Sequence, residues 1–225
     1  MKRKNIKVTC ELCGSTRLST LVDPHLKIND SLLTYTVCND CGFTKKTHLA
    51  LLKAQDEKKQ YDFHENSLEN EGYKAMLEAF LNETVSPFIG QGDVLEFGAG
   101  PGPVLGHLLK EKGFSVTLYD PFYHNDLEVF NKRYDLITST EVFEHFHNPL
   151  KTIKTLVDLL KKDGLLAIQT SFKTDSNEAF LNWWYRRDLT HVSFYTYKSF
   201  QVIAKRFNLE ILYTNHVNKI VLRKR

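Results

Sequence analysis

Short apolar runs alternate with amphipathic segments over the second half of this 225-residue chain. Runs of strand length lie at 93–97, 114–119, 134–140 and 165–172, and segments with helical spacing lie between them at 103–113 and 148–163. Such alternation is typical of βαβ units and therefore of an α/β fold with a mostly parallel sheet. A last amphipathic segment, 196–207, precedes two apolar runs at 209–214 and 219–224, which we expect to pair antiparallel at one edge.

The first half of the chain has a different texture. Residues 1–48 hold two strand-like runs, 21–28 and 32–37, between two pairs of cysteines, and they predict a small separate module. Residues 49–91 predict a helical connector and lid, in which Ser67 caps a helix that Pro87 and Gly90 end. Residues 92–225 then form the predicted α/β domain.

Composition excludes several classes of protein. Hydrophobic residues make up 42% and charged residues 25%, as in a globular domain, and the net charge of +3 is too weak by itself to indicate nucleic-acid binding. Basic residues do gather at both ends of the chain. No apolar run approaches the roughly 20 residues that span a bilayer, and none follows the charged start. We therefore expect a cytoplasmic protein without a membrane partner; its oligomeric state has no signature in the sequence.

The four cysteines form two Cys-x-x-Cys pairs, each followed by glycine: Cys10 with Cys13, and Cys38 with Cys41. This spacing lets both sulfurs of a pair face one tetrahedral zinc ion, so the sequence predicts a zinc ribbon. Two disulfides or four unrelated thiols are the alternatives, and reduced thiols in the cytoplasm disfavour the first. Four thiolates leave no open position for a substrate, which indicates a structural site.

A glycine-rich loop follows the run 93–97. Glycines without Cβ atoms let the backbone turn sharply and approach a ligand, and Pro103 suits the first position of the next helix. An acidic residue at the end of the following strand is placed to bind ribose hydroxyls. The cofactor-binding candidates on these elements are Glu96, Gly98, Ala99, Gly100, Gly102 and Asp120.

Glu141, Glu144 and His145 follow the run 134–140 with spacings i, i+3 and i+4, which share one face if the chain is helical there. In an open α/β sheet, ligands bind at the carboxyl ends of the strands, so these residues are expected to border the cofactor crevice. They suit a divalent ion such as magnesium, manganese or iron, with His191 as a further ligand. The alternatives are a general base, His145 or His191 oriented by Glu144, a general role in shaping the cofactor pocket, or simple helix capping.

Two aromatic segments are candidates for contacts with the ligands. Tyr61 and His64 lie in the predicted lid and are candidates for contacting the cofactor. The segment NWWYRRD supplies candidate substrate contacts for a flat or anionic molecule. In the alternative arrangement its tryptophans pack against the sheet while its arginines face water. The substrate candidates are Trp184, Tyr185, Arg186 and Arg187.

The motifs VLEFGAGPG, TLYDP and ITSTEVFEH, with the closing strands, resemble the class I S-adenosylmethionine-dependent methyltransferases over roughly residues 60–225. The resemblance implies a Rossmann-like sheet with an antiparallel last strand, S-adenosylmethionine as cofactor, and ribose binding by Asp120. One departure is that only the 13 residues 121–133 separate Asp120 from Tyr134. The family's third strand, with its acidic adenine contact, is therefore shortened or missing, and Asp126 is the candidate replacement.

The Glu-x-x-Glu-His segment is similar to that of the ubiquinone-biosynthesis O-methyltransferases and the small-RNA 2′-O-methyltransferases. In the RNA enzymes this segment and a later histidine hold magnesium, which implies metal binding by Glu141, Glu144, His145 and His191 here. We expect methylation of a small hydroxylated molecule, anionic or sugar-type, at oxygen. An RNA methyltransferase that uses the ribbon and the basic termini is the first alternative. A non-catalytic binding module is the second, and the intact motifs disfavour it.

Overall fold

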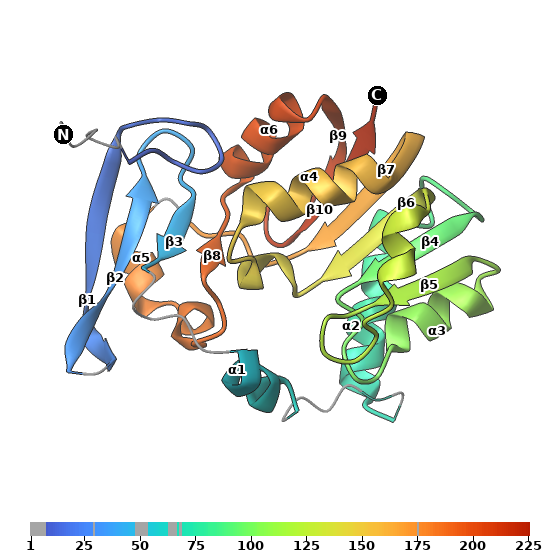
Figure 1. Cartoon of the computed structure of the whole chain (residues 1–225), viewed down its shortest axis with the longest axis horizontal. Coiled ribbons are helices and arrows are strands. Elements are labelled where there is room, and N and C mark those ends of the chain that lie inside the picture. The colour runs from blue at the N-terminus through green and yellow to red at the C-terminus, as the bar shows by residue number, and fades with distance from the viewer. Residues whose placement is uncertain (1–7, 29, 48–53, 63–66, 68, 175) are drawn as a thin grey trace, which may run out of the picture.

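The computed structural model describes residues 8–28, 30–47, 54–62, 67, 69–174 and 176–225, which form two sheets. The smaller sheet is antiparallel and has the order β1-β2-β3-β8. Its strands are β1 (Leu18–Ile28), β2 (Ser31–Cys38), β3 (Thr44–Lys46) and β8 (Ser193–Phe194). The hairpin of β1 and β2 confirms the two strands predicted between the cysteine pairs. Strand β8, however, comes from the far end of the chain (Figure 1).

The larger sheet has six strands in the order β5-β4-β6-β7-β10-β9. Strands β5, β4, β6 and β7 are parallel, and β10 lies antiparallel between β7 and β9, which confirms the mixed α/β sheet. The strands are β4 (Asp93–Phe97), β5 (Ser115–Tyr119), β6 (Tyr134–Thr140), β7 (Leu160–Gln169), β9 (Leu209–Thr214) and β10 (Lys219–Lys224).

Helices cover both faces of this sheet because its strands carry buried apolar residues on both sides. Val94 and Leu136 face the core under one pair of helices, whereas their neighbours Leu95 and Ile137 face the core under the other. Helices α2 (Glu71–Thr84) and α3 (Val104–Glu111) cover the first face, and α4 (Pro149–Leu159) and α6 (Tyr197–Arg206) cover the second. The cysteines of the small module pack into the core of the second face.

Two boundaries differ from the predictions. Helix α2 is capped by Asn70, not Ser67, because the Asn70 side chain accepts the Tyr73 amide at 3.0 Å. Helix α4 ends at Leu159, and the polar residues that follow already belong to β7. The third strand, predicted to be shortened or missing, is missing from the described residues, where Leu127–Asn131 form the 3₁₀ helix η2.

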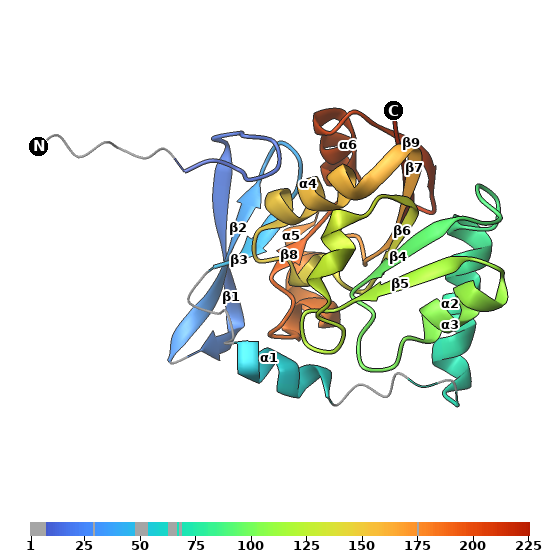
Figure 2. The same ribbon diagram turned by 45° about the vertical axis from the view of Figure 1, so that its right-hand side comes forward.

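The chain leaves the large sheet between β7 and α6 and crosses to the small one. This insert comprises α5 (Asn177–Asn182), the 3₁₀ helix η4 (Trp184–Arg187) and β8, and Figures 1 and 2 show it against the N-terminal strands. Its aromatic core joins Tyr35 of β2 to Phe180 and Phe194, with ring centroids 5.0 and 6.1 Å apart. Helix α1 (Ala54–Tyr61) runs below both sheets in these views.

A buried ion pair fixes the insert to the small sheet. The Arg186 guanidinium, whose side chain is 1% exposed, pairs with Asp23 of β1, whose side chain is 0% exposed. Arg186 also donates to the Leu181 carbonyl, and Asp23 accepts the His25 and Leu26 amides at 2.9 and 3.0 Å. Both charges are therefore neutralised and hydrogen-bonded, as burial requires. None of the helices that the structure describes is long and apolar enough to cross a membrane.

We expect Arg186→Met to lower the free energy of unfolding by about 3–5 kcal/mol, because the Asp23 carboxylate would stay buried without its partner. Arg187→Met is the matched control. The Arg187 side chain is exposed, so this substitution should change the free energy of unfolding by no more than about 0.5 kcal/mol. Urea denaturation of both variants measures the difference. Equal losses in the two would show that the buried pair does not hold the insert.

Candidate active site

A cavity of about 840 Å³ lies at the carboxyl ends of β4, β5 and β6. Most of the residues predicted from the sequence to bind ligands line it. These are Tyr61, Glu96, Gly98, Ala99, Gly100, Asp120, Glu141, Glu144, His145, Trp184, Tyr185 and His191. Gly102, Arg186 and Arg187 are not among the lining residues, and His64 lies outside the described residues.

The glycine loop depends on missing side chains. Gly98 has φ +88° and Gly100 has φ +64°, a region that L side chains rarely adopt. A Cβ atom on Gly98 would lie 2.3 Å from the Val142 side chain, so the loops after β4 and β6 can touch only through glycine. The Gly98 and Ala99 amides donate to the Tyr119 carbonyl at 2.8 and 3.1 Å. The loop therefore forms a rigid, open cradle on the cavity wall.

Asp120 links this cradle to the end of β5. One of its oxygens accepts the Gly100 amide at 3.0 Å, and the other accepts the amides of Phe122 and Tyr123 at 2.8 and 3.2 Å. Carboxylate oxygens have further lone pairs, so Asp120 can still accept ribose hydroxyls. Asp126 does not line the cavity. Its side chain caps η2 by accepting the Glu128 amide at 2.9 Å, which corrects its candidacy as an adenine contact.

Glu96 is 5% exposed, and burial raises its pKa to about 8. Gly106 of α3 faces it: a Cβ atom there would lie 2.5 Å from the Glu96 Oε2 atom. Sequence reasoning missed Gly106, although a glycine inside an amphipathic helix is the signal that identifies such a close approach.

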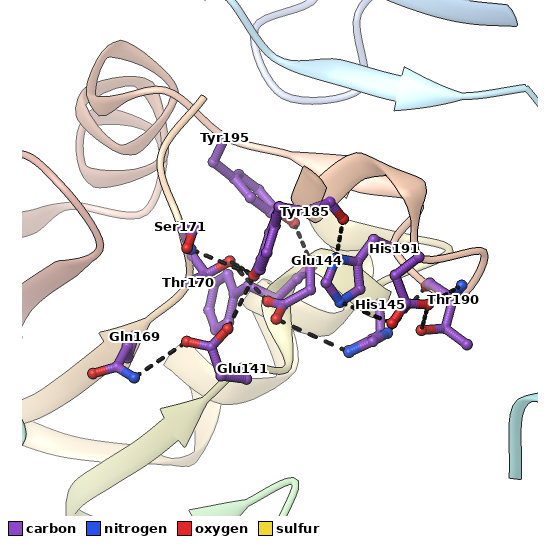
Figure 3. A network of polar contacts seen from close by, with 12 residues as sticks. Glu141, Glu144, His145, Gln169, Thr170, Ser171, Tyr185, Thr190, His191 and Tyr195 are labelled. Carbon is purple, nitrogen blue, oxygen red and sulfur yellow. Dashed lines mark hydrogen bonds and ion pairs between the residues drawn. The ribbon is translucent and has the colours of Figure 1, made fainter. Parts of the chain in front are cut away.

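The Glu-x-x-Glu-His segment is not an α-helix. Glu141 has φ +53°, and only Phe143–His145 form a turn, the 3₁₀ helix η3. The Glu144 side chain is 1% exposed; its Oε2 atom accepts the Thr170 hydroxyl at 2.7 Å, whereas Oε1 has no hydrogen-bond partner. This free Oε1 lies 4.0 Å from the His145 Nε2 atom (Figure 3).

Two backbone carbonyls orient the histidines. The Nδ1 atom of His145 lies 3.0 Å from the Thr190 carbonyl, and that of His191 lies 2.7 Å from the Tyr185 carbonyl. A carbonyl only accepts, so both Nδ1 atoms carry the proton and both Nε2 atoms keep a lone pair. The two rings are 4.8 Å apart. A histidine held in this way is in the tautomer that binds metals through Nε2.

The ligand atoms of Glu144, His145 and His191 lie within 4.8 Å of one another. The structure therefore brings together three of the four predicted ligands. Glu141 is outside this group because its two oxygens accept the Gln169 amide and the Tyr185 hydroxyl, each at 3.2 Å. The orphaned Glu144 oxygen and the two free Nε2 atoms form a donor set that fits a divalent cation.

Burial shifts this cluster toward neutral forms. It raises the pKa of Glu141 to about 8, with help from the nearby Glu144, and it also raises the pKa of Glu144. Burial lowers the pKa of His145, and burial together with the neighbouring His145 lowers that of His191 to about 3. Neutral imidazole is the form that binds metals or accepts a proton.

The side chains of the aromatic segment lie in three different surroundings: the cavity, the contact with the small sheet, and water. Tyr185 is 2% exposed and lies 4.2 Å from the His191 ring, whereas Trp184 is 71% exposed at the cavity. The prediction that Arg186 binds substrate is wrong, because its side chain is buried against Asp23. Successive residues of a 3₁₀ helix point about 120° apart, so neighbours in sequence face different surroundings. Arg187 accordingly faces water.

Helix α1 closes one side of the cavity. Tyr61 packs edge-on against His145, with ring centroids 5.3 Å apart. Glu57 pairs with His147 at 2.8 Å, and Asp62 accepts the Tyr123 hydroxyl at 2.6 Å. The predicted lid thus contacts the loops after β5 and β6.

The four cysteines of the small module converge as predicted. They are free thiols whose sulfur atoms lie within 4.8 Å of one another, with Cys10 and Cys41 3.7 Å apart and Cys13 and Cys38 3.5 Å apart. Tetrahedral zinc with bonds of about 2.3 Å separates its sulfurs by about 3.8 Å, so the cluster could hold zinc. Gly14 and Gly42 have φ +76° and +74°, as the turns after each pair require.

Comparisons with known proteins agree with this geometry. No curated protein matches the sequence. Among solved structures, the mitomycin 7-O-methyltransferase MmcR aligns with a TM-score of 0.55 and 11% identity, over 77% of this chain and 59% of that one. An O-methyltransferase family protein from Burkholderia thailandensis aligns with a TM-score of 0.50 and 11% identity, over 75% and 62% of the two chains. The N-methyltransferase NodS from Bradyrhizobium japonicum WM9 aligns with a TM-score of 0.45 and 15% identity, over 68% and 96%.

These identities are low, so the two structures with TM-scores of 0.55 and 0.50 support the fold and do not define the substrate. The family model described as a methyltransferase domain matches residues 47–214, most of the chain. It covers the glycine cradle, Asp120 and the cluster of Glu144, His145 and His191. The chain therefore belongs to this methyltransferase domain family, and it is an S-adenosylmethionine-dependent methyltransferase.

Proposed function

We propose that the enzyme methylates an oxygen of a small hydroxylated molecule, and that a divalent cation held by Glu144, His145 and His191 assists the transfer. The observation that carries this proposal is the convergence of one unpaired carboxylate oxygen and two Nε2 lone pairs on the cavity that also contains the glycine cradle. Trp184 and Tyr185 supply flat walls beside the same cluster.

In the proposed reaction, the acceptor oxygen attacks the sulfonium methyl group. A carbon–oxygen bond forms, the carbon–sulfur bond breaks with its electron pair going to sulfur, and the acceptor loses its hydroxyl proton. A neutral hydroxyl is a poor nucleophile, and a bound cation would supply the lowered hydroxyl pKa that the attack needs. Glu144 and the two histidines would hold the cation, while the Thr190 and Tyr185 carbonyls keep both imidazoles in the required tautomer.

A metal-free route uses the same residues. The Nε2 atom of His145 or His191 would accept the hydroxyl proton, since both are neutral at physiological pH. Two observations favour the cation. The Glu144 Oε1 atom, which has no hydrogen bond, lies 4.0 Å from the His145 Nε2 atom, and a buried carboxylate oxygen without a hydrogen bond is costly unless a ligand satisfies it. Two imidazoles with one carboxylate also suit manganese or iron better than magnesium.

The charges around the cavity favour a neutral acceptor. Lys151 is the single lysine or arginine among the described lining residues, because Arg186 and Arg187 are not part of the lining. The contacts predicted for an anionic acceptor, those from Arg186 and Arg187, are therefore missing from the lining of the cavity. A neutral molecule with hydroxyl groups, of the sugar type, fits the remaining polar and aromatic walls better.

RNA remains the alternative substrate, with less support. Basic residues near the C-terminus already have partners in the protein: Lys219 pairs with Glu83 at 2.6 Å and Arg223 with Glu210 at 2.5 Å. Lys224 donates to the carbonyls of Val157 and Leu160. The basic residues 2–7 lie outside the described part of the chain.

We further propose that the four cysteines hold a structural zinc ion. We expect about one zinc per purified chain and loss of most of it in Cys38→Ser, because three thiolates bind zinc more weakly than four. Asn39→Ser, between the two cysteines, is the matched control and should keep the metal. Elemental analysis and cobalt-to-thiolate absorption measure both variants. Zinc retained by Cys38→Ser, or disulfides in the native protein, would contradict this site.

Manganese binding tests the second site. We expect Mn²⁺ titration followed by electron paramagnetic resonance to show a site that Glu144→Gln weakens at least about tenfold, since the variant removes the only charged ligand. Glu78→Gln, an exposed glutamate of α2, should bind like the native protein. Mg²⁺ should compete weakly. Equal binding by both variants would contradict the cation and leave the histidine base.

The acceptor class can be tested directly. We expect methyl-labelled S-adenosylmethionine to transfer its label to neutral small molecules in a fractionated cell extract, and not to the RNA fraction. His191→Gln, which lacks the Nε2 lone pair, should lower this transfer at least about 100-fold. Label in RNA, weakened steeply by salt, would instead support the RNA alternative.

A further inference from the structure

The three residues of the cluster come from two different parts of the molecule. Glu144 and His145 lie on η3, directly after strand β6 of the large sheet. His191 lies two residues before β8, which pairs with β3 of the small sheet. A backbone hydrogen bond joins the two parts at the cluster: the Val192 amide donates to the Glu144 carbonyl at 2.8 Å.

Lys46 of β3 holds the loop that carries His191 from both sides. Its backbone amide donates to the Val192 carbonyl at 2.9 Å. Its ammonium group donates to the Asp188 carbonyl at 2.8 Å and reaches the Leu189 carbonyl at 3.5 Å. One residue of the cysteine module therefore binds the chain both before and after His191.

Burying the Lys46 ammonium group costs free energy, and its hydrogen bonds to the loop carbonyls offset part of that cost. The residue is 1% exposed, and burial lowers its pKa to about 8. Among the described residues its ammonium makes hydrogen bonds only to backbone carbonyls, and no carboxylate lies within ion-pair distance. A lysine is rarely placed so deeply without being paired. An apolar side chain would fill the same space at a lower cost, but it would leave the loop carbonyls unpaired.

The module also fixes the group that orients the His191 ring. The Tyr185 carbonyl accepts the Nδ1 proton of His191 at 2.7 Å, and the next residue, Arg186, is paired with Asp23 of β1. Both the backbone of His191 and its hydrogen-bond acceptor are therefore attached to the small sheet.

We propose that the N-terminal cysteine module is a positioning part of the active site, and that Lys46 sets the place and the tautomer of His191. The inference rests on the proposed role of His191 in the methyl transfer. It assigns the module a task inside the enzyme. Lys46 acts through His191 and is not among the residues that line the cavity, so it is a positioning residue.

Lys46→Met tests the proposal without a known acceptor. We expect the amides of His191 and Val192 to exchange with deuterium at least about tenfold faster, because the ammonium bonds that hold their loop are lost. Nitrogen NMR of the imidazoles should show His191 changing from the pure Nδ1–H tautomer to a mixture. The dissociation constant for S-adenosylmethionine, from calorimetry, should stay within about threefold, since the glycine cradle and Asp120 do not contact Lys46.

Arg17→Met is the matched control in the same module. Arg17 forms a surface pair with Asp40 at 3.0 Å and its side chain is 71% exposed, so the exchange rates and the tautomer should remain native. If Lys46→Met does not fold, Lys46→Gln keeps a polar group but is one bond too short, and the same changes are expected. Native exchange and a native tautomer in the folded variant would overturn the proposal.

The outcome is separable from that of the proposed function. If the native protein binds no Mn²⁺ but Lys46→Met changes the tautomer of His191, the positioning role is supported and only the cation is rejected. If Glu144→Gln weakens Mn²⁺ binding while Lys46→Met changes neither this binding nor the tautomer of His191, only the positioning role is rejected.

Discussion

A charged guanidinium cannot be buried without a partner, and the pair of Arg186 with Asp23 is the constraint on which the active site depends. It brings the insert between β7 and α6 onto the small sheet, where β8 can add to β3. The insert in turn carries Tyr185 and His191 to the cavity. Without the small sheet, the insert would have nothing against which to bury Phe180 and Phe194. The cysteine module is thus part of the structure that forms the site.

The same low polarity that makes charges costly sets the chemistry of the cavity. Burial disfavours ionisation of Glu141 and Glu144, and the nearby Glu144 further raises the pKa of Glu141. The two histidines shift in the opposite direction and stay neutral. Such a cluster is stable in two ways: with its carboxyl groups protonated, or with a cation that restores their charge. The hydrogen bonds from Tyr185, Gln169 and Thr170 serve either state because they bind the carboxyl oxygens.

Local patterns predicted what local physics determines. Strand–helix alternation predicted a mostly parallel sheet, and the cysteine spacing predicted a compact cluster, because both depend on neighbouring residues. The segment with Glu144 and His145 was found for the same reason. The helix that its spacing suggested does not include Glu141, because this residue adopts a left-handed conformation after the strand. Pairing of the two-residue strand β8 with β3 has no local signal. For that reason the roles of Lys46 and Arg186, which depend on contacts across more than 140 residues, could not be predicted.

Unpaired buried polar atoms indicate where the fold is incomplete without its ligands. In the described residues they include atoms of Glu96, Thr138, Ser139, Glu144 and Gln169, which come from β4, β6, β7 and the turn after β6. Each such atom costs stability, and a core of apolar residues on both faces of the sheet offsets that cost. Two of these strands, β4 and β6, are among the three whose carboxyl ends form the cavity, and Glu96 and Glu144 line it. A site for polar ligands needs polar groups that the protein itself leaves unpaired, and here such groups gather near the carboxyl ends of the strands of the large sheet.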